Sequence, residues 1–206
     1  MKKSTFVLFT IIILLSFISC NGKKNDNPLP ESMEISVADI IKFGGINWLV
    51  LEKTDDTVLI ISEQILENGR QYHLEYENIT WEQCDLRKYL NGEFYNKTFS
   101  AAEKNLIIET TVKNNDNPEY GTSGGEDTTD NIFSLNIAEA KQYFSDDSSR
   151  VAYNEFYAID NWWLRSPGVL GSSTVFIRFD GSIDIFGGSV YRSIGVRPAL
   201  WLNIQS

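Results

Sequence analysis

A cluster of side chains that could bind a metal lies between Asn114 and Asp130, in a segment that reads NNDNPEYGTSGGEDTTD. Its carboxylates are Asp116, Glu119, Glu126, Asp127 and Asp130. Calcium prefers such oxygen ligands, but their spacing is not that of an EF-hand. Long loops inside compact domains are usually functional or held by other parts of the protein. We favour an ordinary loop with Asx-turns over a calcium site at Asp127 and Asp130, and no other cofactor is indicated.

Acid–base or nucleophilic catalysis would depend on His73, the only histidine, or on Cys84. A lone histidine more often makes an ordinary hydrogen bond, and no nucleophile or orienting partner can be assigned from the spacing. Cys84 falls on or near the apolar face of a predicted helix, and the only other cysteine, Cys20, lies in the N-terminal segment, so we interpret Cys84 as a buried structural thiol. An enzyme that uses His73 as a base with the acidic loop is therefore the weaker functional hypothesis.

The first residues resemble the signal peptide of a bacterial lipoprotein. A positive head at residues 1–3 precedes an apolar run, residues 5–17, that is too short to span a bilayer comfortably. The run ends in Phe17-Ile18-Ser19-Cys20, which resembles a lipobox with Phe17 where Leu is usual. The resemblance implies that residues 1–19 are removed and that Cys20 is acylated, and an uncleaved anchor is the alternative. Residues 20–32 then predict a flexible tether.

Composition limits what the rest of the chain can do. Loss of residues 1–19 leaves 187 of the 206 residues, which predicts one domain over residues 33–206. The net charge of −10 becomes −12 when Lys2 and Lys3 are removed, and this argues against nucleic acid or anionic lipid as a partner. Hydrophobic residues make up 42% and aromatic residues 13% of the sequence, enough for a packed core and for recognition.

Local patterns predict antiparallel strands followed by three helices. Apolar runs at 40–43, 46–51 and 58–62, joined by Gly44-Gly45 and residues 54–56, predict an opening meander. Capping boxes predict where the helices begin. These boxes pair Thr80 with Gln83 for a helix over 81–90, Ser100 with Glu103 for a helix to about Glu109, and Asn136 with Glu139 for a helix to about Phe144.

Near the C-terminus, a hairpin is predicted around Asp180-Gly181-Ser182, with Gly181 in the left-handed conformation. In this register the inner face holds Val175, Ile177, Phe179, Ile183 and Ile185, and the outer face holds Thr174, Phe176, Arg178, Asp184 and Phe186. A two-residue turn would scatter the apolar residues over both faces. The mixed outer face favours a recognition surface, although a sheet covered by a loop accounts equally well for the two Phe.

Several motifs together resemble a bacterial domain family of unknown function. They are Phe43-Gly44-Gly45 with Trp48, the Trp81–Asn91 helix with Cys84 and Arg87, Tyr120-Gly121-Thr122, residues 127–130, Trp162-Trp163-Leu164-Arg165-Ser166-Pro167-Gly168, and residues 195–201 with Arg197. The family resembles C-type-lectin-like domains, in a group that includes the sulfatase-modifying, formylglycine-generating enzymes. The resemblance implies an α+β, C-type-lectin-like fold of antiparallel sheets with two to three helices. Its first and last strands would pair, and its loop-rich C-terminal half would carry the ligand site.

The C-terminal segment is also similar to the variable proteins of diversity-generating retroelements, in which exposed positions vary on a constant frame. The resemblance implies that Trp162, Trp163, Arg165 and Arg197 belong to this frame. The two arginines could serve a binding site or an active site, but we expect them to pair inside the fold with carboxylates such as Asp127 or Asp130. The resemblance also implies binding positions at Ser172, Ser173, Phe176, Arg178, Asp184, Phe186, Tyr191 and Arg192, with Val169 and Gly171 as further variable candidates.

This sequence lacks the motifs on which two activities of the related families depend. Formylglycine-generating enzymes that oxidise cysteine use two late cysteines, and this chain has none after Cys84. The sugar-binding motifs Glu-Pro-Asn, Gln-Pro-Asp and Trp-Asn-Asp do not occur. The main hypothesis is therefore a non-catalytic binding protein of the cell envelope, lipid-anchored to the membrane, with an extracellular protein or glycan as its partner. The alternative is an extracytoplasmic enzyme of unknown reaction in the sulfatase-modifying group.

Overall fold

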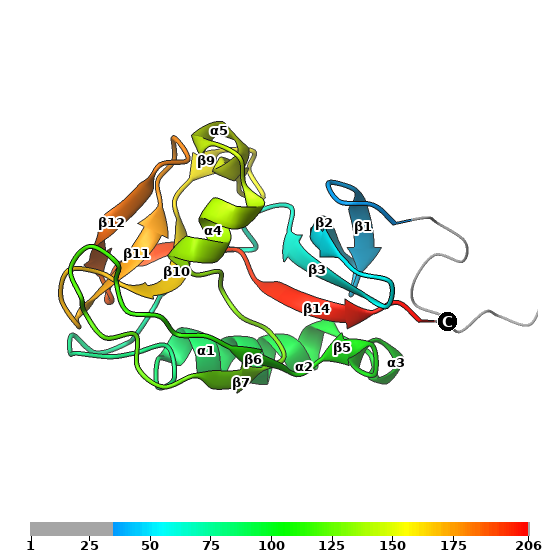
Figure 1. The fold of residues 1–206 in the computed structure, drawn as a ribbon, viewed down its shortest axis with the longest axis horizontal. Helices are drawn as coiled ribbons and strands as arrows, with labels where there is room; N and C mark the ends of the chain where they lie inside the picture. Colours follow the sequence, from blue (N-terminus) through cyan, green and yellow to red (C-terminus); the bar gives the residue numbers. More distant parts are fainter. Residues whose placement is uncertain (1–34, 206) are drawn as a thin grey trace, which may run out of the picture.

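Two five-stranded sheets organise the protein, which has an α+β fold with mostly antiparallel strands (Figure 1). The computed structural model describes residues 35–205. The predicted signal segment, the tether and Cys20 lie outside the described residues. Within residues 35–205, no helix has both the length and the apolar character needed to span a membrane.

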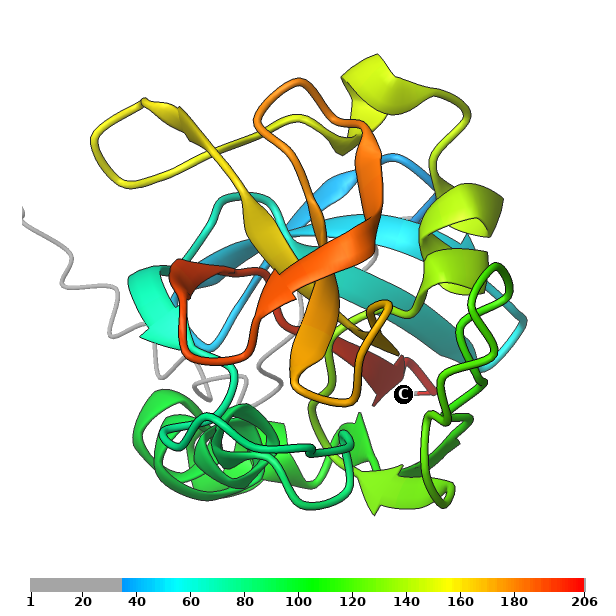
Figure 2. The same ribbon diagram turned by 90° about the vertical axis from the view of Figure 1, so that its left-hand side faces the viewer.

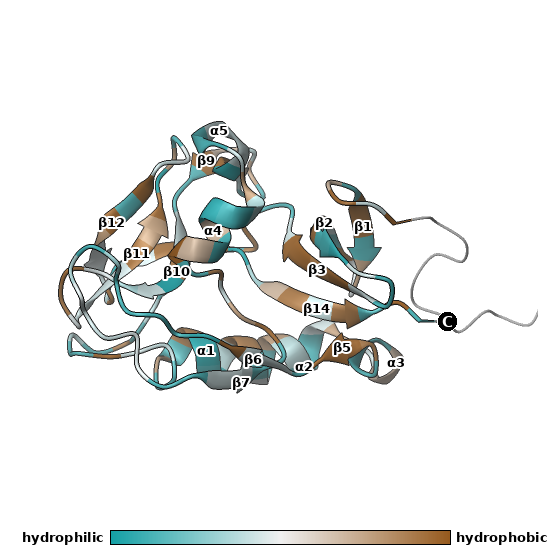
Figure 3. Cartoon of the chain, in the orientation of Figure 1, coloured by the Kyte–Doolittle hydropathy of each residue, from teal (hydrophilic) through white to brown (hydrophobic). Residues whose placement is uncertain are grey.

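The first sheet has the order β1-β2-β3-β14-β5. Its strands are Ile40–Phe43 (β1), Ile46–Lys53 (β2), Thr57–Ser62 (β3), Ala199–Asn203 (β14) and Ile107–Ile108 (β5). The predicted opening meander is confirmed, and β3 is coloured hydrophobic along most of its length (Figure 3). The expected pairing of the first and last strands is wrong, because β14 pairs with β3 and β5 while β1 pairs with β2.

The second sheet has the order β12-β11-β10-β13-β4. Its strands are Ile183–Ser189 (β12), Ser173–Ile177 (β11), Trp162–Pro167 (β10), Ser193–Val196 (β13) and Glu67–Gln71 (β4). Only β10 and β13 run parallel among its neighbours, with Trp162 opposite Gly195. Two short ribbons lie outside both sheets: Thr110–Val112 (β6) with Thr128–Asp130 (β7), and Ala152–Tyr153 (β8) with Ile159–Asp160 (β9).

Side-chain N-caps mark the first residues of the helices that begin at Asp85, Ala101, Ile137 and Asp147. A continuous helical run comprises Asp85–Tyr89 (α1), the π-helix Leu90–Phe94 (η1) and Tyr95–Thr98 (α2), and it is followed by Ala101–Lys104 (α3), Ile137–Tyr143 (α4) and Asp147–Arg150 (α5). The capping boxes at Ser100 and Asn136 are confirmed, but α3 ends at Lys104 because the chain continues into β5. The capping box expected at Thr80 is wrong, since the Cys84 thiol caps α1 by accepting the Arg87 N–H at 3.4 Å.

A core rich in tryptophan joins the sheets. Trp48, Trp81, Trp162 and Trp163 are fully buried. The indole N–H of Trp162 donates to the Arg150 carbonyl at 3.0 Å, and that of Trp163 donates to the Arg70 carbonyl at 2.8 Å. A buried indole needs such a partner, because an unpaired donor would cost free energy. Cys84 is buried as expected, and burial raises the pKa of its thiol to about 12.

Candidate recognition surface

The β11–β12 hairpin has the predicted kind of turn, one residue earlier than expected. Phe179 to Gly181 form the connection, the Arg178 N–H donates to the Ser182 carbonyl at 2.8 Å, and Gly181 has a φ of 84°. Ile177 lies opposite Ile183, so these two residues share a face as predicted. Phe179 was expected on the inner face, but it lies in the turn and its side chain is 58% exposed.

The outward orientation predicted for Phe176 is wrong. Its ring is buried, and it packs edge-on against Trp163 at a centroid distance of 6.1 Å. The Arg192 guanidinium covers the ring at 5.6 Å. β11 lies between β10 and β12, and both of its faces are covered, so every residue of the strand is buried. The alternative of a covered sheet therefore holds for Phe176.

Ser173 is also removed from the surface by burial. Its hydroxyl accepts the Leu170 N–H at 3.0 Å and donates to the Leu170 carbonyl at 2.8 Å. The side chain thus closes the turn that leads into β11. Ser172 is half-buried, and Tyr191 and Arg192 are exposed on the turn between β12 and β13.

Four side chains on and beside the edge strand β12 form two contacting pairs. The Phe186 and Tyr120 rings meet edge-to-face at 6.0 Å, and Arg178 forms an ion pair with Asp184 at 3.0 Å. Partial desolvation raises the pKa of the Tyr120 phenol, and the carboxylates of Glu119 and Asp184 raise it further. We call Tyr120, Arg178, Asp184 and Phe186 the outer-strand group. Phe186 is 58% and Tyr120 41% exposed, so two rings remain open to a partner.

The long acidic loop positions Tyr120. The buried Asn117 amide donates to the Pro167 carbonyl at 2.8 Å and to the Ile185 carbonyl at 3.0 Å. Its oxygen accepts the N–H groups of Glu119 and Tyr120. The Asx-turn that we favoured for this loop is therefore present at Asn117. The sequence reasoning missed both Asn117 and Tyr120 as site residues, although the Asn-Pro pair and the Tyr120 motif were the signals.

The two carboxylates considered for calcium already have protein partners. Asp127 pairs with Lys113, and that hydrogen bond together with one from the Asn114 N–H lowers the pKa of Asp127. Asp130 is buried and accepts hydrogen bonds from Arg87 at 2.6 Å and from the Trp81 indole at 2.8 Å. Within the part of the chain that the structure describes, no group of three or more His, Cys, Asp and Glu side chains could hold a metal ion.

Arg165 and Arg197 are both buried, but only Arg165 has a carboxylate partner. Arg165 makes a two-point contact with Glu139, at 2.6 and 2.7 Å, so the expected partners Asp127 and Asp130 are wrong. Arg197 donates to the Ser62 carbonyl and lies 4.9 Å from the Trp162 ring. Burial lowers the pKa of Arg197 to about 10. These two side chains stabilise the frame and do not belong to the exposed surface.

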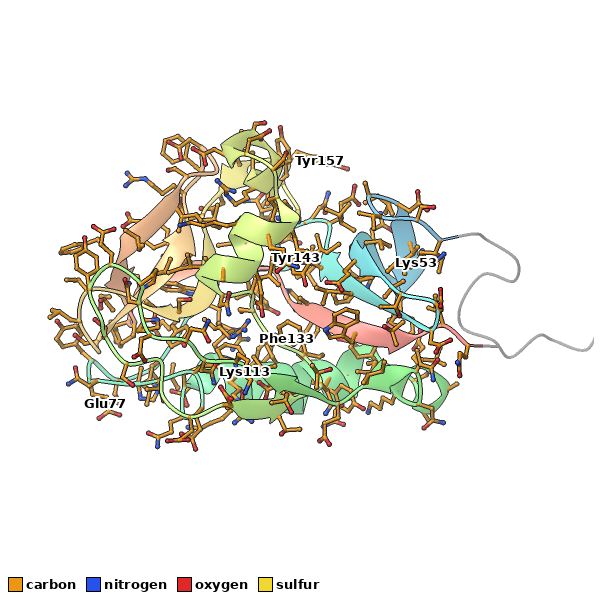
Figure 4. The ribbon with its side chains drawn as sticks, in the orientation of Figure 1. Lys53, Glu77, Lys113, Phe133, Tyr143 and Tyr157 are labelled. Carbon is orange, nitrogen blue, oxygen red and sulfur yellow. The ribbon has the colours of Figure 1, made fainter. Side chains whose placement is uncertain are left out.

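His73 does not contact the acidic loop, with which the enzyme hypothesis paired it. Nδ1 is 2.7 Å from an Asp85 carboxylate oxygen, and Nε2 is 3.0 Å from one of Glu77. Figure 4 labels Glu77 at the periphery of the molecule. The carboxylates nearest His73 are therefore not those of the acidic loop, and His73 connects the segment after β4 to α1.

A cleft of about 340 Å³ includes Thr122, which lies two residues after Tyr120 in the acidic loop. It is lined by Asn78, Ile79, Thr80, Gln83, Thr122, Ser123 and Gly171. The Thr122 hydroxyl donates to the Val169 carbonyl at 3.0 Å and so joins the acidic loop to the segment before β11. The polar side chains of the lining are amides and hydroxyls, which offer hydrogen bonds without charge.

Comparisons with known proteins identify the family of this chain but no individual relative. The model of a family described as a domain of unknown function (DUF6273) matches residues 55–204. No curated protein and no solved structure matches the chain. The family match covers the second sheet, strands β3, β5 and β14 of the first sheet, the acidic loop and all of the outer-strand group, which is more than half of the 206 residues. On that basis the chain belongs to the DUF6273 family.

Proposed function

We propose that this protein is a lipid-anchored recognition protein of the bacterial cell envelope, which binds an extracellular protein or glycan and catalyses no reaction. The outer-strand group is the observation that carries the proposal. Phe186 and Tyr120 stay exposed on a backbone that Asn117 fixes at the Ile185 carbonyl. Aromatic and arginine side chains contribute most to interface energetics, and side chains ordered in advance lose less entropy on binding.

The surroundings favour a partner that offers apolar faces and neutral polar groups. The two exposed rings supply apolar area, and the cleft at Thr122 supplies the amides of Asn78 and Gln83. Arg178 and Asp184 neutralise each other, so the group itself adds no net charge. Sugars and the polar edges of protein loops both fit this chemistry.

A lipid at Cys20 would leave this surface accessible. β1, near the start of the described residues, and the end of β14 lie at one end of the long axis, and β12 lies at the other (Figure 1). An anchor that precedes β1 therefore tethers the end remote from the outer-strand group. The localisation at the cell surface rests on this anchor.

The proposal includes a C-type-lectin-like arrangement and a kinship with retroelement-diversified proteins. It is supported by the return of the last strand into the sheet of the opening meander and by a C-terminal half whose turns leave Tyr191 and Arg192 exposed. The neighbouring DNA tests the kinship. A reverse transcriptase gene with a near-copy of the 3′ end of this gene supports it, and a locus with neither contradicts it.

Binding is tested with the acylated full chain against whole cells and against protein and glycan arrays. Phe186→Ala and Tyr120→Ala are expected to weaken binding by about 2 kcal/mol each, with unchanged melting temperatures. Val37→Ala is the matched control, because Val37 is 58% exposed near the start of the described chain, before β1. Equal binding by all three variants and the parent chain would exclude the outer-strand group as the contact surface.

Lipidation at Cys20 has its own test. Cys20→Ala removes the only sulfur that the proposed pathway can acylate, so cells fed a labelled fatty acid are expected to yield unlabelled, mis-sorted protein. Cys84→Ala is the control and keeps the label, because Cys84 is buried in the fold. A labelled Cys20→Ala protein would show that the assignment is wrong.

A further inference from the structure

The β8–β9 hairpin carries a cluster of exposed apolar side chains that the recognition surface does not use. Tyr153 and Ile159 lie opposite each other on the two strands and are each 47% exposed. Phe156 and Tyr157, in the turn between them, are 76% and 80% exposed. We call these four residues the aromatic tip. The hairpin projects from the body of the molecule (Figure 2), and Tyr157 lies at its periphery (Figure 4).

Hydrogen bonds fix the backbone of the turn in the aromatic tip, although its rings are largely exposed. Tyr157 has a φ of 57°, a left-handed conformation that costs a side-chain-bearing residue about 1–2 kcal/mol. Asn154 holds it there, because its side-chain oxygen accepts the N–H groups of Phe156 and Ala158 and its carbonyl accepts the N–H of Tyr157. A strained residue that its neighbours fix in place, with its ring left outside, points to a use for that ring.

The bonding in the turn suits a medium without water. Three successive N–H groups, those of Phe156, Tyr157 and Ala158, are satisfied within the tip at 2.9–3.1 Å. A backbone donor that enters lipid unpaired costs several kcal/mol, so prior pairing removes one obstacle to insertion. Tyrosine and phenylalanine are also side chains that anchor proteins at the boundary between lipid headgroups and acyl chains.

The charges near the tip select the kind of lipid. Residues 151–160 contain no Lys or Arg, and they include Glu155 and Asp160. The whole chain has a net charge of −10, so anionic headgroups would repel it. Zwitterionic headgroups impose no such penalty, and they leave the apolar side chains to determine binding.

The chain outside the described residues is long enough to allow this contact. The 14 residues between Cys20 and Ile35 span up to about 50 Å when extended. A compact domain of this size is about 40 Å across, so the tether is long enough for the aromatic tip to reach the bilayer. We propose that the aromatic tip inserts into a zwitterionic lipid surface and fixes the orientation of the domain on the membrane. This inference rests on the lipid anchor of the proposed function, and it is independent of the ligand.

The experiment places an environment-sensitive fluorophore on the acylated full chain in phosphatidylcholine vesicles. Tyr157→Cys and, separately, Phe156→Cys provide the attachment points, and labelling is selective because Cys84 is buried and Cys20 carries lipid. Tyr76→Cys is the matched control, since Tyr76 is another exposed aromatic residue, 68% accessible, on the segment after β4. We expect the labels at 156 and 157 to shift to the blue, to be quenched by lipids brominated in their acyl chains, and to lose quenching by aqueous iodide.

The outcomes separate the tip from the anchor. Flotation of the protein with the vesicles reports the anchor, and quenching reports the tip. A protein that floats while its labels at 156 and 157 behave like the label at 76 overturns the insertion alone, and leaves the tip to a protein partner. A protein that does not float with the vesicles overturns both the lipid anchor and the insertion of the tip. Replacing half of the phosphatidylcholine by phosphatidylglycerol is expected to reduce the blue shift, and an increase would contradict the preference for zwitterionic lipid.

Discussion

The β11–β12 and β8–β9 hairpins solve the same backbone problem in different ways. Each turn needs a residue with positive φ, and that residue is Gly181 in the first hairpin and Tyr157 in the second. The first turn packs on α5, where the Gly181 carbonyl accepts a hydrogen bond from Arg150 at 2.9 Å. In the second turn, Asn154 accepts the N–H groups of Phe156, Tyr157 and Ala158. Glycine occupies the position where neighbouring atoms leave no room for a Cβ. Tyrosine occupies the position where the side chain is exposed to solvent.

The comparison separates a positive φ that close packing requires from a positive φ that holds an exposed side chain. An ideal Cβ on Gly181 would lie 1.7 Å from the Asp147 carbonyl oxygen, so no other residue fits without movement of α5. Nothing comparable forces a tyrosine at 157, since asparagine adopts the left-handed region more readily. The first hairpin should therefore lose stability when altered, and the second should lose a function.

The largest effect is expected inside the β11–β12 hairpin. Phe176→Ala should lower the free energy of unfolding by about 3–5 kcal/mol, because it leaves a cavity under Trp163 and Arg192. Denaturant unfolding measures this change. Phe186→Ala, on the exposed strand beside it, should change stability by less than about 0.5 kcal/mol. Equal losses in the two variants would mean that both rings belong to the core, and the outer-strand group would not exist.

A smaller loss is expected from the turn itself. Gly181→Ala should destabilise the fold by about 2–4 kcal/mol, which combines the cost of a left-handed alanine with the contact against Asp147. Gly45→Ala is the matched control, because Gly45 also has a positive φ but has no heavy atom within 4 Å of the added Cβ. Its loss should be about 1 kcal/mol, from the backbone alone. Similar melting temperatures for the two variants would show that α5 does not restrict the turn.

The smallest effect, and one of opposite sign, is expected at Tyr157. Tyr157→Asn should raise the free energy of unfolding by about 0.5–1 kcal/mol, since asparagine relieves the left-handed strain and the ring makes little contact. Thermal unfolding of the full chain without lipid measures the gain. A loss of stability would place the Tyr157 ring in the packing of the domain and remove the contrast between the two hairpins.

Sequence reasoning succeeded where a structure depends on neighbouring residues. The opening meander, the caps at Ser100 and Asn136 and the left-handed Gly181 each follow from a few adjacent side chains. It failed at Thr80, where a plausible capping pattern precedes α1 by one turn. The thiol of Cys84 takes that role, and thiols are weak acceptors that capping rules do not rank.

Contacts distant in sequence account for the errors at the candidate site. Alternation assigned Phe176 to an open face, but Arg192 from a later turn covers it. The Arg165 partner is Glu139, a residue that had been assigned only a capping role and that also caps α4. Tyr120 meets Phe186 because Asn117 bonds to the strand segments at 167 and 185. Such pairings depend on how the sheets and loops assemble, which no short pattern encodes.

The position of β14 has a consequence for the order of synthesis. This strand comes last in the chain, yet it lies between β3 and β5, both of which are made much earlier. Until residues 199–203 have left the ribosome, the edge of β3 has no partner and the first sheet cannot close. A premature stop codon before residue 199 would accordingly remove an inner strand of the sheet and leave the exposed edge of β3 open to aggregation.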